Sequence, residues 1–502
     1  MQLGDLVDAL GTRIAAALEG DPMTEVTGVS HDSRRVVRGD LFCAVPGTRV
    51  DGHDHAAAAA QSGAGALLVE RRLDVAIPQV LVPDVRAAMG PAASLILGVP
   101  SRSLRVFGVT GTNGKTTTTY LIESMARAAG MSAGVIGTIE TRVDGVPLPA
   151  GLTTPEAPDL QQVLARMRDG GVGVVAMEVS SHALEFGRVG GTWFAAATFL
   201  NLSHDHLDFH GSLDAYFAAK ARLFDPALAA VAVVNVADPY GARLVDLCRE
   251  RELRTVTFAG AVEEAATTAG ADTRADVRAD DVRLGASGTT FTLVAPSWGS
   301  PRSVATNLVG SFNVTNAVAA AASALAGGMS LDAVAGGLAA DIRVPGRFEP
   351  VDRGQDFTVV VDYAHTPDAL AHALQAAREI TQNRVLVVFG CGGDRDREKR
   401  AVMGAVAAAN ADVAYVTSDN PRSEDPAAIV DAVRSGIPAD ANAVVELDRR
   451  RAIERALADA VAGDVVVVAG KGHESGQIIG DTVRPFDDRL VVADLLEGHS
   501  CG

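Results

Sequence analysis

The fold of this chain is decided by one short stretch, Gly108-Val109-Thr110-Gly111-Thr112-Asn113-Gly114-Lys115-Thr116-Thr117-Thr118. It follows apolar residues that predict a buried strand over 104–110, and it opens a predicted helix over 116–129. Glycines let backbone N–H groups approach phosphate oxygens, and the N-terminus of the helix adds partial positive charge. Lys115 is expected to reach the β- and γ-phosphates of a nucleotide, and Thr116 to hold Mg²⁺. Val109 stands where the strict pattern has glycine, so a chance glycine-rich loop is the alternative.

Strands and helices alternate on both sides of this loop. Buried strands are predicted at 172–177, 195–200 and 231–236, and again at 358–361, 384–389, 413–417 and 465–469. This rhythm indicates an α/β fold with parallel sheets covered by helices on both faces. Between the two series lie a predicted mixed β insert (261–303), an Ala-rich helix (312–326) and a candidate hinge (341–347).

Composition limits the classes of protein that need to be considered. With 502 residues, two to four domains are expected. A formal net charge of −18 disfavours a nucleic-acid or anionic-membrane partner, although a phosphorylated small substrate remains compatible. The four cysteines show neither metal-ligand spacing nor a disulfide framework, so a reduced cytoplasmic location is expected. No signal peptide is evident and no apolar run is long enough to insert into a membrane.

Three further features suggest a metal or acid cluster. Glu178 follows a predicted strand, where ligands of such sheets bind, although a solvated strand-end charge is an equally good interpretation. The segment 204–210 holds three His and two Asp, which suggests metal or phosphate binding. Zinc is a rival there, but no Cys accompanies them and the H-E-x-x-H spacing is absent; a surface His-rich turn is the other alternative. For Lys220, the residues alone favour a snorkelling surface lysine over a partly buried, reactive amine.

Taken together, these residues resemble the Mur ligases of peptidoglycan synthesis, in the family's order and over nearly the whole chain. The motifs that carry the resemblance are Gly111-Thr112-Asn113-Gly114-Lys115-Thr116-Thr117, Glu178-Val179-Ser180-Ser181-His182, Asn201-Leu202 with Asp205-His206-Leu207-Asp208, Gly310-Ser311-Phe312-Asn313 with Asn316, Pro345-Gly346-Arg347-Phe348-Glu349, and Asp362-Tyr363-Ala364-His365-Thr366-Pro367. Three more resemble the branch that adds the third residue of the stem peptide: Asp32-Ser33-Arg34 with Thr48-Arg49-Val50, Asp419-Asn420-Pro421-Arg422, and Gly470-Lys471-Gly472-His473-Glu474.

The resemblance implies three domains: an N-terminal UDP-binding domain (1–102), a central parallel-sheet P-loop ATPase domain (103–341) and a C-terminal Rossmann-like amino-acid-binding domain (342–502). It also implies ATP-dependent ligation of diaminopimelate to the D-Glu side-chain carboxylate of UDP-N-acetylmuramoyl-L-Ala-D-Glu through an acyl phosphate. The expected partners are these small molecules and ATP, with Mg²⁺ as the metal and a monomer as the oligomeric state. Closure of the third domain over the second would bring the amine to the activated acid.

The resemblance also assigns roles to individual residues. ATP would be bound by Gly111, Thr112, Asn113, Gly114, Lys115, Thr116, Thr117, Asn313, Arg347 and Asp362. Mg²⁺ would be held by Thr116, Glu178, His206 and a carbamylated Lys220, and the catalytic residues would be Lys115, Lys220, His206 and Arg347. The UDP-linked substrate would contact Ser33, Thr48, Arg49, Val50, Thr153, Thr154, Ser180 and Arg188. Diaminopimelate would contact Arg395, Asp419, Asn420, Pro421, Arg422, Gly470 and Glu474.

Some positions depart from the family or leave alternatives open. Phe186 stands where a Gln commonly contacts substrate, and Leu152 replaces an amide side chain. The loop 389–394 resembles a dinucleotide fingerprint without its third glycine, and we interpret it as a substrate loop. Arg422 disfavours the lysine-adding relative, because a guanidinium can grip the second carboxylate of diaminopimelate. A folylpolyglutamate synthase and a non-catalytic nucleotide-binding scaffold are the more distant alternatives, and the meso and LL isomers are not distinguished.

Overall fold

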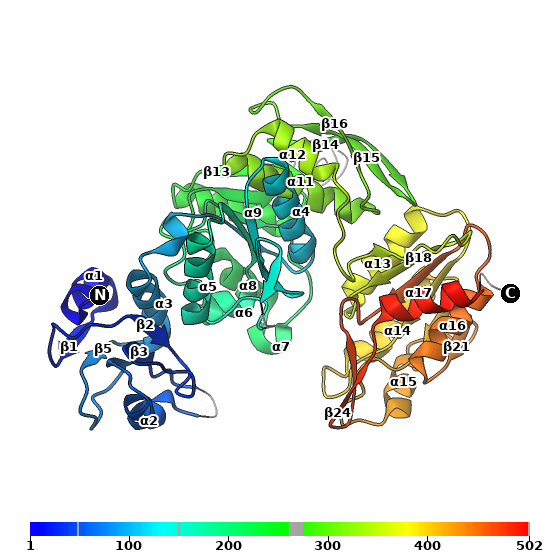
Figure 1. Cartoon of the computed structure of the whole chain (residues 1–502). Coiled ribbons are helices and arrows are strands. Elements are labelled where there is room, and N and C mark those ends of the chain that lie inside the picture. The colour runs from blue at the N-terminus through cyan, green and yellow to red at the C-terminus, as the bar shows by residue number, and fades with distance from the viewer. Residues whose placement is uncertain (48–49, 149–150, 261–274, 500–502) are drawn as a thin grey trace. The chain divides into compact units, whose positions relative to one another are not determined.

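The computed structural model describes residues 1–47, 50–148, 151–260 and 275–499 (Figure 1). Thr48 and Arg49 of the predicted uridine loop lie outside the described residues, as do 261–274 of the predicted β insert. The chain divides into two compact units. Unit 1 comprises 1–202, 206–258 and 319–337, and unit 2 comprises 203–205, 259–318 and 338–502.

Unit 1 begins with a five-stranded sheet in the order β1-β5-β4-β3-β2, in which only the β1–β5 pair is antiparallel. The strands are β1 (Ala17–Glu19), β2 (Gly28–Ser30), β3 (Asp40–Cys43), β4 (Ala66–Val69) and β5 (Gln79–Leu81). The accompanying helices are α1 (Leu3–Ile14), η1 (Gly52–His55), α2 (Ala56–Gln61), α3 (Val85–Ile96) and η2 (Pro100–Arg102). The Asp84 side chain accepts a hydrogen bond from Ala87 N and so caps α3, the helix that leads toward the next sheet.

The second sheet of unit 1 contains the phosphate loop, and its strands are ordered β13-β12-β11-β6-β10-β7-β8-β9. The strands are β6 (Arg105–Thr110), β7 (Ala133–Ile136), β8 (Thr141–Val143), β9 (Val146–Leu148), β10 (Val174–Glu178), β11 (Ala196–Phe199), β12 (Ala232–Asn235) and β13 (Thr255–Ala259). The six strands from β13 to β7 pair in parallel, and β8 and β9 add to β7 as an antiparallel edge. The strands predicted at 104–110, 172–177, 195–200 and 231–236 are therefore confirmed.

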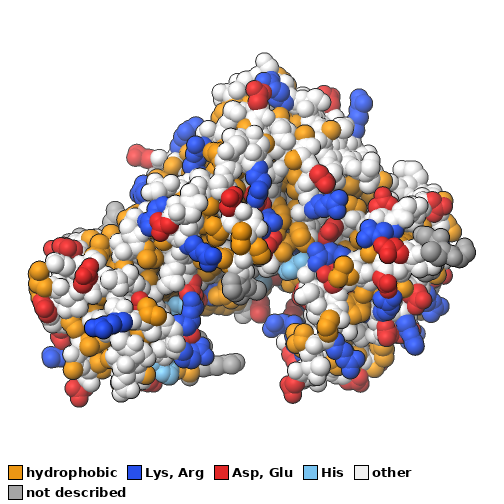
Figure 2. Space-filling model, viewed as in Figure 1, with side chains coloured by type: hydrophobic (Ala, Val, Ile, Leu, Met, Phe, Trp, Pro, Cys, Tyr) orange, Lys and Arg blue, Asp and Glu red, His pale blue; other side chains and the backbone are white. Residues whose placement is uncertain are grey.

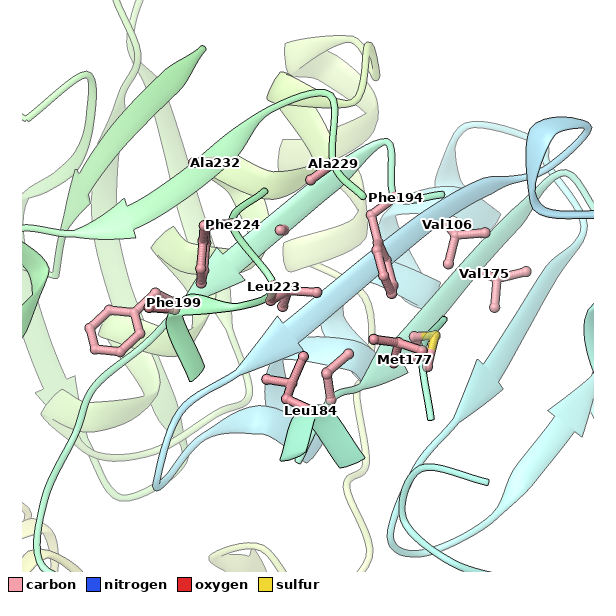
Figure 3. Packing of buried hydrophobic residues seen from close by; sticks show 14 of the residues in the cluster. Val106, Val175, Met177, Leu184, Phe194, Phe199, Leu223, Phe224, Ala229 and Ala232 are labelled. Carbon is pink, nitrogen blue, oxygen red and sulfur yellow. The ribbon is translucent and has the colours of Figure 1, made fainter. Parts of the chain in front are cut away.

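Helices connect these strands, and all of them except the short α7 bury apolar side chains. They are α4 (Lys115–Ala128), α5 (Ala157–Asp169), α6 (Ser181–Glu185), α7 (Leu207–His210), α8 (Leu213–Ala221) and α9 (Pro239–Glu250). Figure 3 shows part of the resulting core, which includes Val106, Val175, Met177, Phe194 and Leu223. Within the parallel pairs, Glu178 is in register with Val109, and Phe199 with Thr110, so β6, β10 and β11 end at one edge.

Unit 2 contains an antiparallel segment and a six-stranded sheet. The antiparallel strands are β14 (Val277–Gly285), β15 (Gly288–Val294) and β16 (Arg302–Thr306). The next helix, α11 (Ser311–Ala326), begins in unit 2 and ends in unit 1, and α12 (Leu331–Leu338) belongs to unit 1 except for its last residue. The described part of the predicted mixed β insert is thus antiparallel. The six-stranded sheet has the order β17-β18-β22-β19-β20-β21, and only β17 pairs antiparallel.

The six-stranded sheet is covered on both faces, as expected of a Rossmann-like domain. Its strands are β17 (Glu349–Pro350), β18 (Thr358–Asp362), β19 (Val385–Phe389), β20 (Val413–Val416), β21 (Ala443–Val445) and β22 (Val465–Ala469). Its helices are α13 (Pro367–Glu379), α14 (Lys399–Asn410), α15 (Pro426–Arg434), α16 (Arg449–Asp459) and α17 (Asp488–His499), and β23 (Gly476–Ile479) and β24 (Thr482–Pro485) form a separate hairpin.

The valine runs of this sheet alternate between two cores. Val465 and Val467 pack with residues of α13, α14 and α15, whereas Val466 and Val468 pack with residues of α16 and α17. A continuous apolar run is what a strand buried on both faces requires. The predicted α/β fold class is confirmed, and among the described residues no helix is long and apolar enough to cross a membrane.

Candidate functional site

The glycine-rich loop connects the end of β6 to the start of α4. Gly114, with φ of 87°, precedes the helix, and Lys115 Nζ donates to the carbonyls of Gly111 and Thr112, each at 2.9 Å. A Cβ on Gly111 would come within 2.9 Å of Leu200 Cβ, so the loop needs glycine there. Asn201 Oδ1 accepts from Thr112 N at 3.0 Å and Asn113 N at 2.9 Å. Asn201 thus holds the loop in shape, a role that the sequence did not reveal.

Glu178 is buried at the end of β10, so the alternative of a solvated strand-end charge is wrong. Its side chain accepts hydrogen bonds from Thr116 Oγ1 at 3.0 Å, Thr138 N at 2.8 Å and Thr138 Oγ1 at 3.0 Å. Thr138 was not predicted, because it is distant in sequence and follows β7 without a motif of its own. The carboxylate of Glu178 and the hydroxyl of Thr116 are oxygen donors of the kind that Mg²⁺ prefers, and this ion keeps water and phosphate as its other ligands.

Lys220 is buried on α8, with 1% of its surface exposed, and the expected snorkelling surface lysine is therefore wrong. Its Nζ donates to Gly111 O at 2.8 Å and lies 4.4 Å from the centroid of the Tyr216 ring. The buried amine thus contacts the glycine-rich loop at the Gly111 carbonyl and lies beside the face of the Tyr216 ring. A lysine placed beside a phosphate loop is consistent with the predicted role in the metal site.

Two histidines of the 204–210 segment, His206 and His210, lie beside α6. His206 has a left-handed backbone with φ of 52°, and its ring centroid lies 4.8 Å from that of His182. His210 Nε2 is 2.9 Å from Ser181 Oγ, and burial, followed by the charge of His182, lowers the pKa of His210. In the part of the chain that the structure describes, no three His, Cys, Asp or Glu side chains converge as a metal-binding group.

The residues predicted to hold the muramoyl dipeptide surround Glu178. Thr153 Oγ1 lies 3.1 Å from Thr138 Oγ1, at the edge of the carboxylate's network. Thr154 is fully buried; its hydroxyl donates to Glu178 O at 2.9 Å and accepts from Ser180 N at 3.1 Å. Ser180 Oγ caps α6 by accepting from Ala183 N. Arg188 Nε donates to Glu156 Oε1 at 2.9 Å.

The predicted uridine site lies on the five-stranded sheet of unit 1. Ser33 is partly buried in the turn after β2, and Val50 is 58% exposed. The neighbouring Arg34 guanidinium donates to both carboxylate oxygens of Asp32, at 2.9 and 2.8 Å, and it lowers the pKa of Asp32 to about 2. Thr48 and Arg49 are outside the described residues, so their predicted contacts stay a prediction.

Unit 2 holds the residues predicted to meet the adenosine and the γ-phosphate. Asn313 is buried at the start of α11, where its Nδ2 donates to Val309 O at 2.8 Å. Asp362 ends β18 and accepts from Phe348 N at 2.7 Å and Ala364 N at 2.8 Å; burial raises its pKa. The Arg347 guanidinium lies 4.7 Å from the Tyr363 ring centroid. The structure therefore brings Arg347 and Asp362 together at the carboxyl end of β18.

The predicted amino-acid residues also converge within unit 2. Gly392 lies between the two arginines, because a Cβ on it would come within 2.9 Å of Arg422 Nη1 and 3.8 Å of Arg395 Cγ. Asn420 Nδ2 donates to Glu474 Oε2 at 2.8 Å. The remaining predicted residues adjoin them: Asp419 is close to Gly470, and Pro421 is close to Gly393.

Lys471 is a residue of this pocket to which no role was assigned. It is fully buried, and its Nζ donates to Asn420 Oδ1 at 3.2 Å, Glu474 Oε2 at 2.9 Å and Gly476 O at 2.7 Å. The ammonium therefore fixes the Asn420 amide and the Glu474 carboxylate, two of the groups predicted to bind the amino acid. Its position inside the 470–474 motif is the feature of the sequence that could have identified Lys471 as a residue of this site.

Charged side chains on one face of the molecule are mixed rather than gathered into a basic patch. On the face shown in Figure 2, basic and acidic side chains of the described residues are interspersed. The basic groups that matter here, Lys115, Lys220 and Lys471, are instead held by backbone carbonyls or side chains in the sites described above.

Comparison with known proteins gives full-length matches. Residues 25–103 match the Mur ligase family catalytic domain, 109–324 the Mur ligase middle domain, and 346–472 the Mur ligase glutamate ligase domain. The UDP-N-acetylmuramoyl-L-alanyl-D-glutamate--2,6-diaminopimelate ligase of Streptomyces coelicolor is 46% identical, covering 99% of this chain and 96% of that protein. The protein of the same name from Geobacillus kaustophilus is 47% identical over 94% of each chain. A solved structure with that name superposes with a TM-score of 0.72 at 34% identity, covering 100% of this chain and 99% of that one.

Proposed function

The chain belongs to the Mur ligase family, and from this membership we propose that it joins 2,6-diaminopimelate to UDP-N-acetylmuramoyl-L-alanyl-D-glutamate in peptidoglycan synthesis. The observation that carries the proposal is the identity of 46–47% over nearly the full length of ligases with that name. The protein is an ATP-dependent ligase that forms a carbon–nitrogen bond. The position of Arg395 and Arg422 beside Gly392 in unit 2 supports diaminopimelate over lysine, because lysine has no second carboxylate for a guanidinium to bind.

The first proposed step is transfer of the γ-phosphoryl group of ATP to the D-Glu side-chain carboxylate. A carboxylate is a poor electrophile, and phosphorylation gives it a good leaving group. Lys115 would bind the phosphates from the loop, and Thr116, Glu178, His206 and a carbamylated Lys220 would hold Mg²⁺. When bound, the ion would neutralise charge on the transferring phosphoryl group. The burial of Glu178 beside Thr116 supports this donor set.

The second proposed step is attack of the amine on the acyl phosphate, which releases phosphate through a tetrahedral intermediate. Arg395 and Arg422 would bind the far carboxylate of diaminopimelate, and Asn420 and Glu474 would accept from an ammonium group. Arg347 would contact the γ-phosphate, Asp362 the ribose and Asn313 the adenine. The close grouping of Arg422, Asn420 and Glu474 within unit 2 supports the amino-acid part of this scheme.

The proposal also assigns the domains, the residues that bind the UDP-linked substrate, the oligomeric state and the location. The domains would be 1–102 for the UDP moiety, 103–341 for ATP and 342–502 for the amino acid. Ser33, Thr48, Arg49, Val50, Thr153, Thr154, Ser180 and Arg188 would bind the UDP-linked substrate. The protein would act as a cytoplasmic monomer, without nucleic-acid partners or membrane insertion.

The reaction is tested by supplying purified protein with ATP, Mg²⁺, the UDP-dipeptide and, separately, labelled meso-diaminopimelate, LL-diaminopimelate or L-lysine. We expect ligation and equimolar phosphate release with a diaminopimelate isomer, and neither with lysine. Placing ¹⁸O in the D-Glu side-chain carboxylate should transfer one ¹⁸O to the phosphate that is released, as an acyl phosphate requires. Ligation of lysine alone, or ATP hydrolysis that ignores the amino acid, would overturn the proposal.

A further inference from the structure

An aromatic and cationic surface in unit 1 includes Arg188, which is among the residues proposed to bind the UDP-linked substrate, and its other three residues have no role in the reaction described so far. It is formed by Arg86 of α3, Phe186 and Arg188 after α6, and Phe209 of α7, and we call it the α3–α7 strip. The Arg86 guanidinium lies 5.2 Å from the Phe186 ring centroid, and that of Arg188 lies 5.6 Å from it. The Phe209 ring centroid is 5.6 Å from that of Phe186.

The strip leads from the five-stranded sheet to the proposed metal site. Arg86 is in the first turn of α3, which packs on the five-stranded sheet. At the other end, the Phe209 ring is 4.3 Å from that of His182, which in turn is 4.8 Å from that of His206. The contacts thus connect the region proposed for uridine with the residues proposed to surround the acid that is phosphorylated.

The two arginines of the strip share one carboxylate partner. Glu156 is the shared partner of both arginines: its Oε1 accepts from Arg188 Nε at 2.9 Å, and its Oε2 is 3.7 Å from Arg86 Nη1. The Arg188 side chain is 14% exposed and Arg86 is 33% exposed. One carboxylate therefore serves two guanidiniums, and Arg86 is the more weakly held and more accessible cation.

The aromatic residues give the strip an apolar face that folding alone does not explain. Phe209 is 41% exposed although it is a large apolar side chain, and it lies on a four-residue helix without buried residues. Aromatic faces suit the C–H faces of sugar rings and small methyl groups, and a guanidinium stacked on the ring suits a neighbouring carboxylate or phosphate. A ligand that is partly apolar, partly anionic and extended fits both properties.

We propose that Arg86, Phe186 and Phe209 bind the muramoyl-peptide part of the UDP-linked substrate, an inference that rests on the proposed function. Phe186 and Phe209 pack against the sugar and the alanyl methyl group, and Arg86 pairs with an anionic group of the same ligand. A Gln commonly contacts the substrate at position 186 in the family, and Phe186 cannot make its hydrogen bond. The packing and charge of the α3–α7 strip compensate for that loss. It also makes a helix of the N-terminal region part of the substrate site of the central sheet.

The test measures steady-state kinetics of Phe186→Ala, Phe209→Ala and Arg86→Met, which keeps the apolar stem of the arginine. We expect the KM for the UDP-dipeptide to rise about tenfold or more for Arg86→Met and about fivefold for each Phe variant. The KM values for ATP and diaminopimelate should stay within about twofold of wild type, and Phe186→Leu should retain most of the affinity. The matched control is Arg243→Met, which removes another Arg stacked 4.7 Å over a Phe ring, that of Phe217, and paired with a carboxylate, Asp214.

Binding of the UDP-dipeptide by calorimetry without ATP separates this inference from the reaction itself. If wild type binds the ligand but does not turn over, the proposed function fails, whereas weakened binding by the strip variants still supports the strip. UDP-N-acetylglucosamine, which has the pyrophosphate but no carboxylate, identifies the partner of Arg86: its inhibition constant rises in Arg86→Met only if the pyrophosphate is the anion. The inference would be overturned if all three variants fold and bind the UDP-dipeptide as tightly as wild type. It would also be overturned if the variants lose as much affinity for ATP as for the UDP-dipeptide.

Discussion

At the scale of single residues, two side chains of the proposed sites are attached to strained backbone. His206 and Arg422 both have left-handed φ values, 52° and 53°, which residues other than glycine rarely adopt. Such a conformation costs on the order of 1 kcal/mol or more and persists only where the surroundings hold it. For Arg422 the surroundings are two backbone hydrogen bonds to the β23–β24 hairpin, from its N to Ile478 O at 3.0 Å and from Gly480 N to its O at 2.7 Å. The hairpin thus holds the backbone of Arg422, and the guanidinium donates through Nη1 to Gly393 O at 2.7 Å.

Arg422→Lys should therefore damage amino-acid binding selectively. A lysine has one point charge and cannot bind a carboxylate through two parallel N–H groups. We expect the KM for diaminopimelate to rise at least about tenfold while the KM for ATP is unchanged, as measured by phosphate release. Arg397→Lys is the matched control, because Arg397 is exposed on the loop that carries Arg395 and pairs with Glu424 at 3.2 Å. An equal effect of both substitutions would contradict the assignment.

Lys220 should carry a carbamate in the active protein. The neutral amine reacts with CO₂, and the product would supply an acidic ligand where the structure has a buried lysine beside Gly111. Protein equilibrated with ¹³C-bicarbonate should show a carbamate carbon signal that is lost in Lys220→Arg and retained in Lys399→Arg. Activity should fall in CO₂-depleted buffer and recover on addition of bicarbonate; activity that is independent of CO₂ would refute the modification.

At the scale of helices and strands, most of the fold could be predicted because local patterns decide it. Valine-rich runs marked 385–389 and 465–469 as strands buried on both faces, and the glycine-rich loop marked the boundary of β6 and α4. Contacts between distant segments were not predictable in this way. Thr138 binds Glu178 across 40 positions, and Asn201 binds Asn113 across 88, and neither pair has a spacing that a single sequence reveals. The burial of Lys220 was missed for the same reason.

The buried ion pair between α16 and α17 should be essential for the C-terminal sheet. Arg449 and Asp488 are both fully buried, with Arg449 Nη2 2.7 Å from Asp488 Oδ2 and 2.9 Å from Ala469 O at the end of β22. Asp488→Ala leaves a buried guanidinium without its counter-charge, which should cost about 3 kcal/mol or more. Chemical denaturation should show this loss, whereas Asp494→Ala, which breaks an exposed pair with Arg450, should cost less than about 1 kcal/mol. Equal effects would contradict the expected role of burial.

At the scale of the whole molecule, the proposed chemistry is divided between the two units. Lys115, Glu178 and Lys220 belong to unit 1, whereas Arg347, Asp362 and Arg422 belong to unit 2. An amine can attack an acyl phosphate only when the reacting atoms are about 3–3.5 Å apart. The reaction therefore requires a state in which both units contribute to one site, and substrate binding would supply the free energy to populate it.

This requirement leads to a prediction about distance changes between the units. Fluorophores on Val146→Cys in unit 1 and Val483→Cys in unit 2 would sit at exposed positions, since these side chains are 61% and 65% exposed. The native Cys43, Cys248 and Cys391 are buried and should not react, and Cys501→Ser removes the fourth thiol. We expect energy transfer between the labels to change when a non-hydrolysable ATP analogue, the UDP-dipeptide and diaminopimelate are all present. A label pair within unit 2, Val402→Cys with Val483→Cys, should show no change.

Lys115→Ala should abolish the response to the nucleotide, because the loop loses its phosphate-binding cation. If the inter-unit signal stays constant with all ligands bound while turnover proceeds, the two units do not need to move, and the active arrangement already exists in the free protein.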